Sequence, residues 1–214
     1  PNYLAVSFDV AEKTFRDDIY KDYKGKRVKA DQDLYDQIPL VYKIVEVFDI
    51  PIYTKSGFEA DDVIGTVAKK LSKKNLETII VTGDMDMLQL VDKNTKVYEL
   101  RKGMSDIVLF DEKKVKEKYG FGPEMVVDYK SLRGDASDNI PGLEGFGPKT
   151  AVSLLQEFGT LEAVLAQPEK VPGKKKQDTL IQGKEIALMS KQLATIHLGV
   201  DFPKETDFFL LKEP

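Results

Sequence analysis

Thr78-Ile79-Ile80-Val81-Thr82-Gly83-Asp84 is the stretch of the sequence that decides the fold. Its β-branched run, closed by a glycine and an aspartate, is typical of a buried parallel strand that ends in a loop. Helical periodicity precedes this run at residues 60–71 and returns after residue 111. Because strands that alternate with helices form βαβ units, we expect a mostly parallel sheet.

The rest of the chain fits this arrangement. Short apolar runs predict further strands at residues 3–8, 50–53, 96–100 and 107–110, and helical spacing predicts a helix over residues 34–48 that Pro39 bends or starts. Later helices are expected at residues 111–119, 123–132, 149–158, 160–166 and 176–193. The predicted fold class is α/β, with a mostly parallel central sheet flanked by helices in residues 1–110. A helical region in residues 111–214 is expected to pack on it.

The composition limits the possible chemistry. The 214 residues include no cysteine and a single histidine, His197, and the net charge is −4. Disulfides, thiolate metal sites and His-rich zinc sites are therefore excluded, and any metal must be held by oxygen. The sequence has neither an apolar run long enough for a membrane span nor a signal segment, which predicts a cytoplasmic monomer without membrane contact.

Acidic residues gather where the predicted elements begin and end. Ligands of open α/β sheets bind beyond the carboxyl ends of the strands, although each acid alone could be a turn former or a helix cap. If these acids converge, two carboxylates about 4 Å apart repel by roughly 4 kcal/mol, and protons or cations must relieve that repulsion. The acids in question are Asp9, Glu59, Asp61, Asp84, Asp86, Asp135 and Asp138.

Hard divalent cations with oxygen ligands, Mg²⁺ or Mn²⁺, meet this need. Two such ions roughly 3.5 to 4 Å apart stabilise the attacking and leaving oxygens of an in-line phosphoryl displacement. The sequence therefore predicts a two-metal site that hydrolyses phosphodiesters.

A predicted helix starts in the segment Ser56-Gly57-Phe58-Glu59-Ala60-Asp61-Asp62, in which three acids lie within four positions. Ser56 followed by Glu59 predicts a capping box, which accounts for the helix start without any metal. At 100° per residue, Glu59 and Asp61 flank the apolar stripe while Asp62 points nearly opposite. We therefore expect Glu59 and Asp61 to be metal ligands and Asp62 to lie outside them.

A glycine-rich turn between two helical patterns is a candidate phosphate site. Backbone N–H groups at a helix start bind phosphate, and glycines allow close approach of the backbone. Such contacts would not read base sequence. The alternative is a plain connection between two helices. The residues expected to contribute are Gly142, Gly145, Gly147, Lys149 and Thr150.

Five ordered motifs resemble those of the flap endonuclease family, and above all the 5′ to 3′ exonuclease domain found in bacterial DNA polymerase I. They are residues 8–9, 57–62, 82–86, 134–142 and 145–151, and the resemblance covers nearly the whole chain. It implies a structure-specific nuclease that uses two metal ions on 5′ flaps, nicks and 5′ ends of DNA in replication and repair. It also implies a covalently linked polymerase domain as a partner.

The resemblance assigns roles to individual residues. Asp9, Glu59 and Asp61, with Asp62 nearby, resemble ligands of a first metal, and Asp84, Asp86, Asp135 and Asp138 resemble the second-metal group. The glycine-rich turn resembles a helix-hairpin-helix that binds duplex DNA and often K⁺. Tyr23, Lys24 and Arg27 resemble the base of the family's helical arch, which implies that Tyr23 binds DNA and that Lys24 and Arg27 act in catalysis near the scissile phosphate, although a solvated basic helix would have the same composition.

The sequence departs from the family in one respect, because the family begins with a further strand that ends in another metal-binding aspartate. Without them, metal binding is expected to be weaker. The alternative function is therefore a non-catalytic, structure-selective DNA-binding module or an inactive fragment. A haloacid-dehalogenase-like phosphatase, which Asp9 at a strand end would also allow, is set aside because Ala11 occupies the place of its second aspartate.

Overall fold

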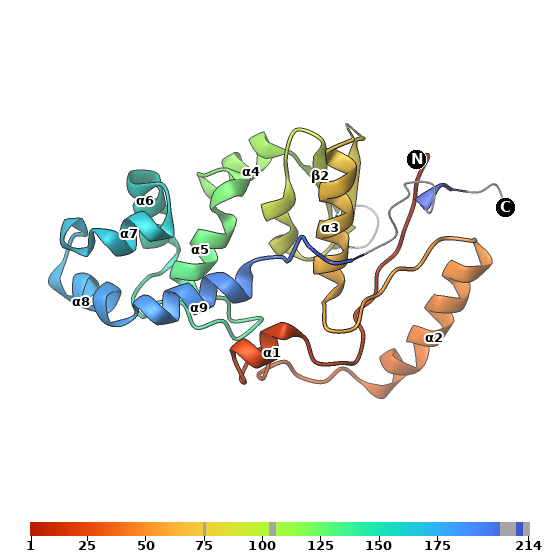
Figure 1. Cartoon of the computed structure of the whole chain (residues 1–214), viewed down its shortest axis with the longest axis horizontal. Coiled ribbons are helices and arrows are strands. Elements are labelled where there is room, and N and C mark those ends of the chain that lie inside the picture. Colours follow the sequence, from red (N-terminus) through yellow and green to blue (C-terminus); the bar gives the residue numbers. More distant parts are fainter. Residues whose placement is uncertain (75, 103–105, 202–208, 212–214) are drawn as a thin grey trace.

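The computed structural model describes residues 1–74, 76–102, 106–201 and 209–211. The helical part of the chain forms one end of the molecule, the sheet and helix α3 (Ala60–Ser72) lie in the middle, and helix α2 (Gln32–Val47) lies at the other end, near both termini (Figure 1). Within the described residues, no helix is long and apolar enough to cross a membrane.

The described sheet has three strands in the order β1 (Thr78–Thr82), β2 (Thr95–Lys102) and β3 (Asp106–Phe110). β1 pairs parallel with β2, and β2 pairs antiparallel with β3. The fold is therefore mixed α/β, and the expectation of a mostly parallel sheet holds for one of the two described pairings. The second pairing is antiparallel because only three residues separate β2 from β3, whereas a parallel crossover needs about a dozen.

The predicted buried strand at residues 3–8 is wrong, as is the strand at residues 50–53. This part of the chain is extended but makes only isolated bridges, between Val6 and Ile52 and between Tyr3 and Leu210. Leu4 is exposed and Val6 only partly buried. A single bridge does not form the ladder that defines a strand, and the apolar run therefore lies outside the described sheet.

The helical region follows the predicted pattern with one break. Helix α8 (Lys174–Gln182) ends at Gly183 and α9 (Lys184–Ala194) begins there, so the single helix expected at residues 176–193 is two helices. A Cβ at Gly183 would lie 2.5 Å from Leu143 Cδ2. The remaining helices are α1 (Phe15–Ile19), α4 (Glu112–Tyr119), α5 (Val126–Arg133), α6 (Pro148–Phe158) and α7 (Leu161–Ala166), with short 3₁₀ helices η1 (Met85–Leu90), η2 (Pro123–Met125) and η3 (Pro168–Lys170).

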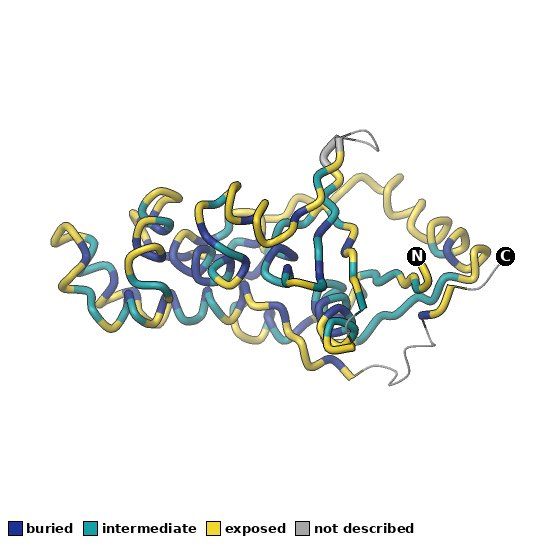
Figure 2. Tube along the Cα trace, turned by 90° about the horizontal axis from the view of Figure 1, so that it is seen from above, coloured by how far each residue is buried: buried dark blue, intermediate teal, exposed yellow. Residues whose placement is uncertain are grey.

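One hydrophobic core joins the sheet to the helical region. Met87 of η1, Val97 of β2 and Leu155 of α6 belong to the same buried cluster and are fully buried. Helix α2, by contrast, runs through Pro39 and exposes most of its apolar side chains, as its yellow trace in Figure 2 shows. The shared core fixes η1 and α5 relative to each other, and these elements carry the acids described next.

Candidate metal and nucleic-acid site

Helix α3 begins three residues later than the predicted capping box requires. Glu59 is its N-cap, and Glu59 and Asp62 form a reciprocal capping box in which the backbone N–H of Glu59 donates to Asp62 Oδ2 at 3.1 Å. The box expected between Ser56 and Glu59 is wrong, because Gly57 has φ +81° and the helix starts only at Ala60. The hydroxyl of Ser56 donates to Glu12 instead.

Asp62 lies fully buried beneath this helix start and is bound by an arginine. Arg16 Nη1 and Nη2 donate to Asp62 Oδ2 and Oδ1, each at 2.8 Å, and the backbone N–H of His197 donates to Oδ1 at 2.8 Å. Every carboxylate oxygen of Asp62 thus has protein donors, which leaves Asp62 outside the group of candidate ligands. Arg16 was not predicted as a site residue, because nothing in its local sequence distinguishes it from a solvated arginine.

Glu59 is surrounded by cationic and hydroxyl donors. Lys24 Nζ lies 2.7 Å from Glu59 Oε1, and the hydroxyl of Tyr23 lies 3.3 Å from Oε2. The same hydroxyl donates to Asp138 Oδ2 at 3.2 Å. Burial, together with the charges of Glu59 and Asp138, raises the pKa of Tyr23, so its hydroxyl remains a proton donor. Tyr23 therefore links two of the predicted acidic groups.

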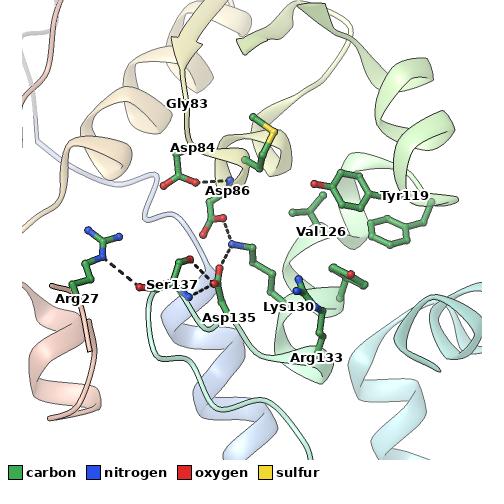
Figure 3. Close-up of a pocket in the computed structure, with 13 residues that line it drawn as sticks. Arg27, Gly83, Asp84, Asp86, Tyr119, Val126, Lys130, Arg133, Asp135 and Ser137 are labelled. Carbon is green, nitrogen blue, oxygen red and sulfur yellow. Dashed lines mark hydrogen bonds and ion pairs between the residues drawn. The ribbon is translucent and has the colours of Figure 1, made fainter. Parts of the chain in front are cut away.

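The acids that follow β1 face those at the end of α5 (Figure 3). Asp84 caps η1 by accepting from the backbone N–H of Asp86 at 2.8 Å. Lys130 of α5 lies between Asp86 and Asp135, with Nζ 2.5 Å from Asp135 Oδ2 and in ion-pair contact with Asp86. Burial would raise the pKa of Asp135, but the hydrogen bonds from Lys130 and Ser137 outweigh it and hold that pKa at about 2.

Asp138 forms an ion pair with an arginine. Arg27 Nη2 lies 2.6 Å from Asp138 Oδ1. Burial opposes the charge of Arg27, but its hydrogen bond and proximity to Asp138 raise the pKa of the guanidinium overall. Tyr23, Lys24 and Arg27, which were predicted together as the base of an arch, therefore all contact predicted metal ligands.

The pKa of Asp61 shows how the acids of these segments affect one another. Its pKa is raised to about 7, first by burial and then by the negative charges of Asp84, Asp9 and Glu59. Asp9 is fixed at the same helix start, where its Oδ1 accepts from the backbone N–H of Ala60 at 2.8 Å. Burial is also the largest cause of the raised pKa of Asp84. The acids predicted from three distant segments thus act on one another.

Within the described residues, no three acidic side chains are close enough to hold one ion. Lys24 and Lys130 lie against the carboxylates instead, as the ion pairs above show. The donor set itself consists of carboxylate oxygens and suits a hard divalent cation. The lysine ammonium groups are therefore the groups that a bound cation would displace.

A cavity of about 490 Å³ opens beside Asp84, Asp86 and Asp135. Its far wall is aromatic and basic, and Figure 3 shows the hydroxyl of Tyr119 pointing toward the acids and Arg133 at the lower edge. Burial raises the pKa of Tyr119, which keeps it protonated. Tyr119 and Arg133 were not predicted from the sequence, because they meet through Tyr129, whose ring centroid lies 6.0 Å from that of Tyr119 and 5.7 Å from Arg133 Cζ.

The glycine-rich turn is divided between the interior and the surface. Gly142 is buried with φ +59°, a Cβ there would lie 2.1 Å from the backbone nitrogen of Gly134, and its N–H donates to Ser190 Oγ at 3.2 Å. Gly145 and Gly147 are exposed, with Lys149 beside them at the start of α6. Gly145 and Gly147 therefore face solvent, whereas Gly142 acts as a packing residue.

Solved structures show which class of fold this is. The chain has a TM-score of 0.76 and 22% identity to a bacteriophage T5 flap endonuclease in a complex with DNA and metal ions, covering 91% of this chain and 73% of that one. It has a TM-score of 0.60 and 19% identity to the catalytic core of Rad2 in complex with DNA substrate, covering 97% of this chain and 67% of that one. The fold is therefore that of the flap endonucleases.

The chain belongs to the 5′-3′ exonuclease family: residues 1–120 match its N-terminal resolvase-like domain and residues 121–214 its C-terminal SAM fold. DNA polymerase I of Bacillus caldotenax is 43% identical over 196 residues, which is 92% of this chain and 22% of that protein. DNA polymerase I of Chloroflexus aurantiacus is 42% identical over 210 residues, 97% of this chain and 22% of that protein. The chain thus spans about a fifth of the length of these relatives.

Proposed function

We propose that this chain is a structure-specific 5′ nuclease that hydrolyses DNA phosphodiester bonds at 5′ flaps, nicks and 5′ ends with two divalent cations. The observation that supports this most directly is the raised pKa of Asp61, which burial and the charges of Asp84, Asp9 and Glu59 produce together. Buried acids that raise one another's pKa mark a cation or catalytic site. Membership of the 5′-3′ exonuclease family supports the choice of substrate.

Two groups of acids would hold Mg²⁺ or Mn²⁺ after the ions displace Lys24 and Lys130 and draw the carboxylates closer together than they lie in this structure. Such ions supply Lewis acidity toward the phosphate and lower the pKa of an attacking water. We assign the first ion to Asp9, Glu59 and Asp61. The second ion is assigned to Asp84, Asp86, Asp135 and Asp138.

The lysine and arginine side chains that pair with these acids have a second role once the acids bind metal ions. Lys24 and Arg27 are partly exposed at the mouth of the site and are paired to Glu59 and Asp138. Once metal ions neutralise these carboxylates, the two side chains are available to bind a phosphate of the DNA. We therefore propose that Lys24 and Arg27 bind the scissile phosphate, and that Tyr23 keeps Glu59 and Asp138 at a fixed distance from each other.

The exposed half of the glycine-rich turn would hold duplex DNA. Gly145, Gly147, Lys149 and Thr150 lie at or beside the start of α6, where backbone N–H groups and a lysine suit a phosphate. The family resemblance adds a K⁺ ion at this turn. The DNA polymerase I relatives support a role in bacterial replication and repair, in the cytosol, beside a covalently linked polymerase domain.

The test is cleavage of a 5′-flap duplex in Mg²⁺. We expect wild-type chain to cut near the junction, EDTA to stop cutting, and Asp84→Ala to lose at least about 100-fold in rate because one charge of the acidic group is gone. The second candidate, a structure-selective DNA-binding module, is favoured by the absence of a three-acid cluster among the described residues. Flap binding with no metal-dependent cutting would establish that second candidate instead.

A further inference from the structure

Arg16 connects three separate parts of the fold through its buried guanidinium. It lies on α1 with 2% of its surface exposed. Besides the two bonds to Asp62, its Nε donates to the carbonyl of Leu193 and its Nη2 to the carbonyl of Thr195, both at 2.9 Å. Burial opposes its charge, yet the hydrogen bond and the charge of Asp62 raise the pKa of Arg16 above its usual value. The guanidinium therefore stays charged and ties α1 to α3 and to the end of α9.

Asp62 connects Arg16 to the candidate metal ligands. Its Oδ2 accepts from the backbone N–H of Glu59 at 3.1 Å, which fixes the residue where α3 begins. Arg16 Nη1 also lies 3.5 Å from Glu59 Oε2. Asp61 directly precedes Asp62 in the first turn of α3, so the ion pair anchors the backbone next to both Glu59 and Asp61.

The other end of the network reaches the glycine-rich turn. The backbone N–H of His197 donates to Asp62 Oδ1, and Ser190 of α9 accepts from the backbone N–H of Gly142. Helix α9 thus contacts the ion pair at its C-terminal end and the turn through Ser190, and Figure 1 shows α1 below that end of α9. Neither Arg16 nor Asp62 lines the cavity beside Asp84, Asp86 and Asp135.

A buried ion pair is weak evidence for stability, because the cost of desolvation can exceed the attraction. We propose that Arg16 and Asp62 are a positioning pair that fixes Glu59 and Asp61 for metal binding and sets α3 relative to α9. This inference rests on the proposed nuclease function. It assigns Asp62 to positioning and not to coordination.

The test is Mn²⁺ binding by the full chain without DNA, measured by isothermal titration calorimetry. Arg16→Lys keeps the charge but loses the planar fork, which contacts Asp62 and two carbonyls at once. We expect Arg16→Lys and the isosteric Asp62→Asn each to weaken Mn²⁺ binding by about 10-fold or more, as removal of groups that orient metal ligands does elsewhere. The cleavage kcat should fall while KM for flap DNA stays within about 2-fold.

Lys191→Met is the control, because Lys191 pairs with a buried acid of the helical region away from the candidate ligands, 2.7 Å from Asp128, and also lies 2.7 Å from the exposed Glu162. It should lower the melting temperature and leave Mn²⁺ affinity unchanged. If Arg16→Lys and Asp62→Asn behave like this control, the positioning role is refuted. If Asp61→Asn and Asp84→Ala also leave Mn²⁺ affinity unchanged, the proposed metal site fails as well, and the two failures are thereby distinguished.

Discussion

At the scale of single residues, the site is a set of acids whose mutual repulsion is only partly relieved. Lys24, Lys130 and Arg27 each pair with acids, while burial and the repulsion that remains raise the pKa of Asp61 to about 7. A carboxyl with a raised pKa in the folded chain is protonated more readily there than in the unfolded chain. It therefore contributes stability below its unfolded pKa of about 4, and that contribution is lost as pH rises through about 7.

We accordingly expect the metal-free chain to lose thermal stability between about pH 4 and pH 7 through Asp61. Mg²⁺ should raise the melting temperature most above about pH 7, where the acid is ionised and can bind a cation. Differential scanning calorimetry over this pH range measures both effects, and Asp61→Asn should flatten them. A Mg²⁺ effect that is the same at low and high pH would contradict the role of Asp61.

Lys130 offers a second test at this scale. Because burial raises the pKa of Asp135 while Lys130 is the first group that lowers it, Lys130→Met should move that pKa from about 2 to near or above the ordinary value. Titration of the carboxyl carbon by NMR measures this change. A pKa that stays at about 2 would show that Ser137 alone accounts for the shift.

At the scale of elements, the sequence identified most helices, because apolar spacing and caps are local signals. The sequence did not predict features of the helices that depend on contacts between distant residues. Gly183, between α8 and α9, has no room for a side chain because a Cβ there would lie 2.5 Å from Leu143, forty residues earlier in the chain. Helix α3 starts at Ala60 because Asp62 is held by Arg16 and can cap Glu59, which no local rule predicts. The acids themselves were found because they follow element ends.

The glycine-rich turn gives a paired prediction. Gly142→Ala would place a Cβ 2.1 Å from the backbone of Gly134 and should destabilise the fold by roughly 3 kcal/mol or more. Gly145→Ala at φ +81° meets nothing within 4 Å among the described residues, so it should cost only about 1 to 2 kcal/mol of left-handed strain. Urea unfolding measures both. Equal losses would refute the division of the turn into a packed and an exposed half.

At the scale of the whole molecule, two candidate functional regions share one core. The acids lie around the start of α3, η1 and the end of α5, while the exposed turn lies at the start of α6, and α5 and α6 belong to the same hydrophobic cluster. We expect this rigid connection to set the distance between a bound duplex and the acids. Because the net charge is −4, we also expect DNA binding to depend on local groups such as Lys149.

Lys149→Ala should therefore weaken duplex binding and reduce the salt dependence of the binding constant by about one phosphate contact. Mn²⁺ affinity should be unchanged, because Lys149 contacts none of the acids in the interactions described above. Fluorescence anisotropy at several salt concentrations measures the slope. Lys113→Ala, on the exposed side of α4, is the control, and an equal loss for both variants would contradict a specific role for the turn.

The central claim is that acids from distant segments form a centre for two divalent cations. The most direct measurement is the number of Mn²⁺ ions bound per chain above about pH 7, determined by electron paramagnetic resonance of free Mn²⁺. We predict about two ions for the wild-type chain and about one for Asp84→Ala, since that variant leaves Asp9, Glu59 and Asp61 intact. No saturable binding, or binding that Asp84→Ala and Asp61→Asn leave unchanged, would contradict the claim.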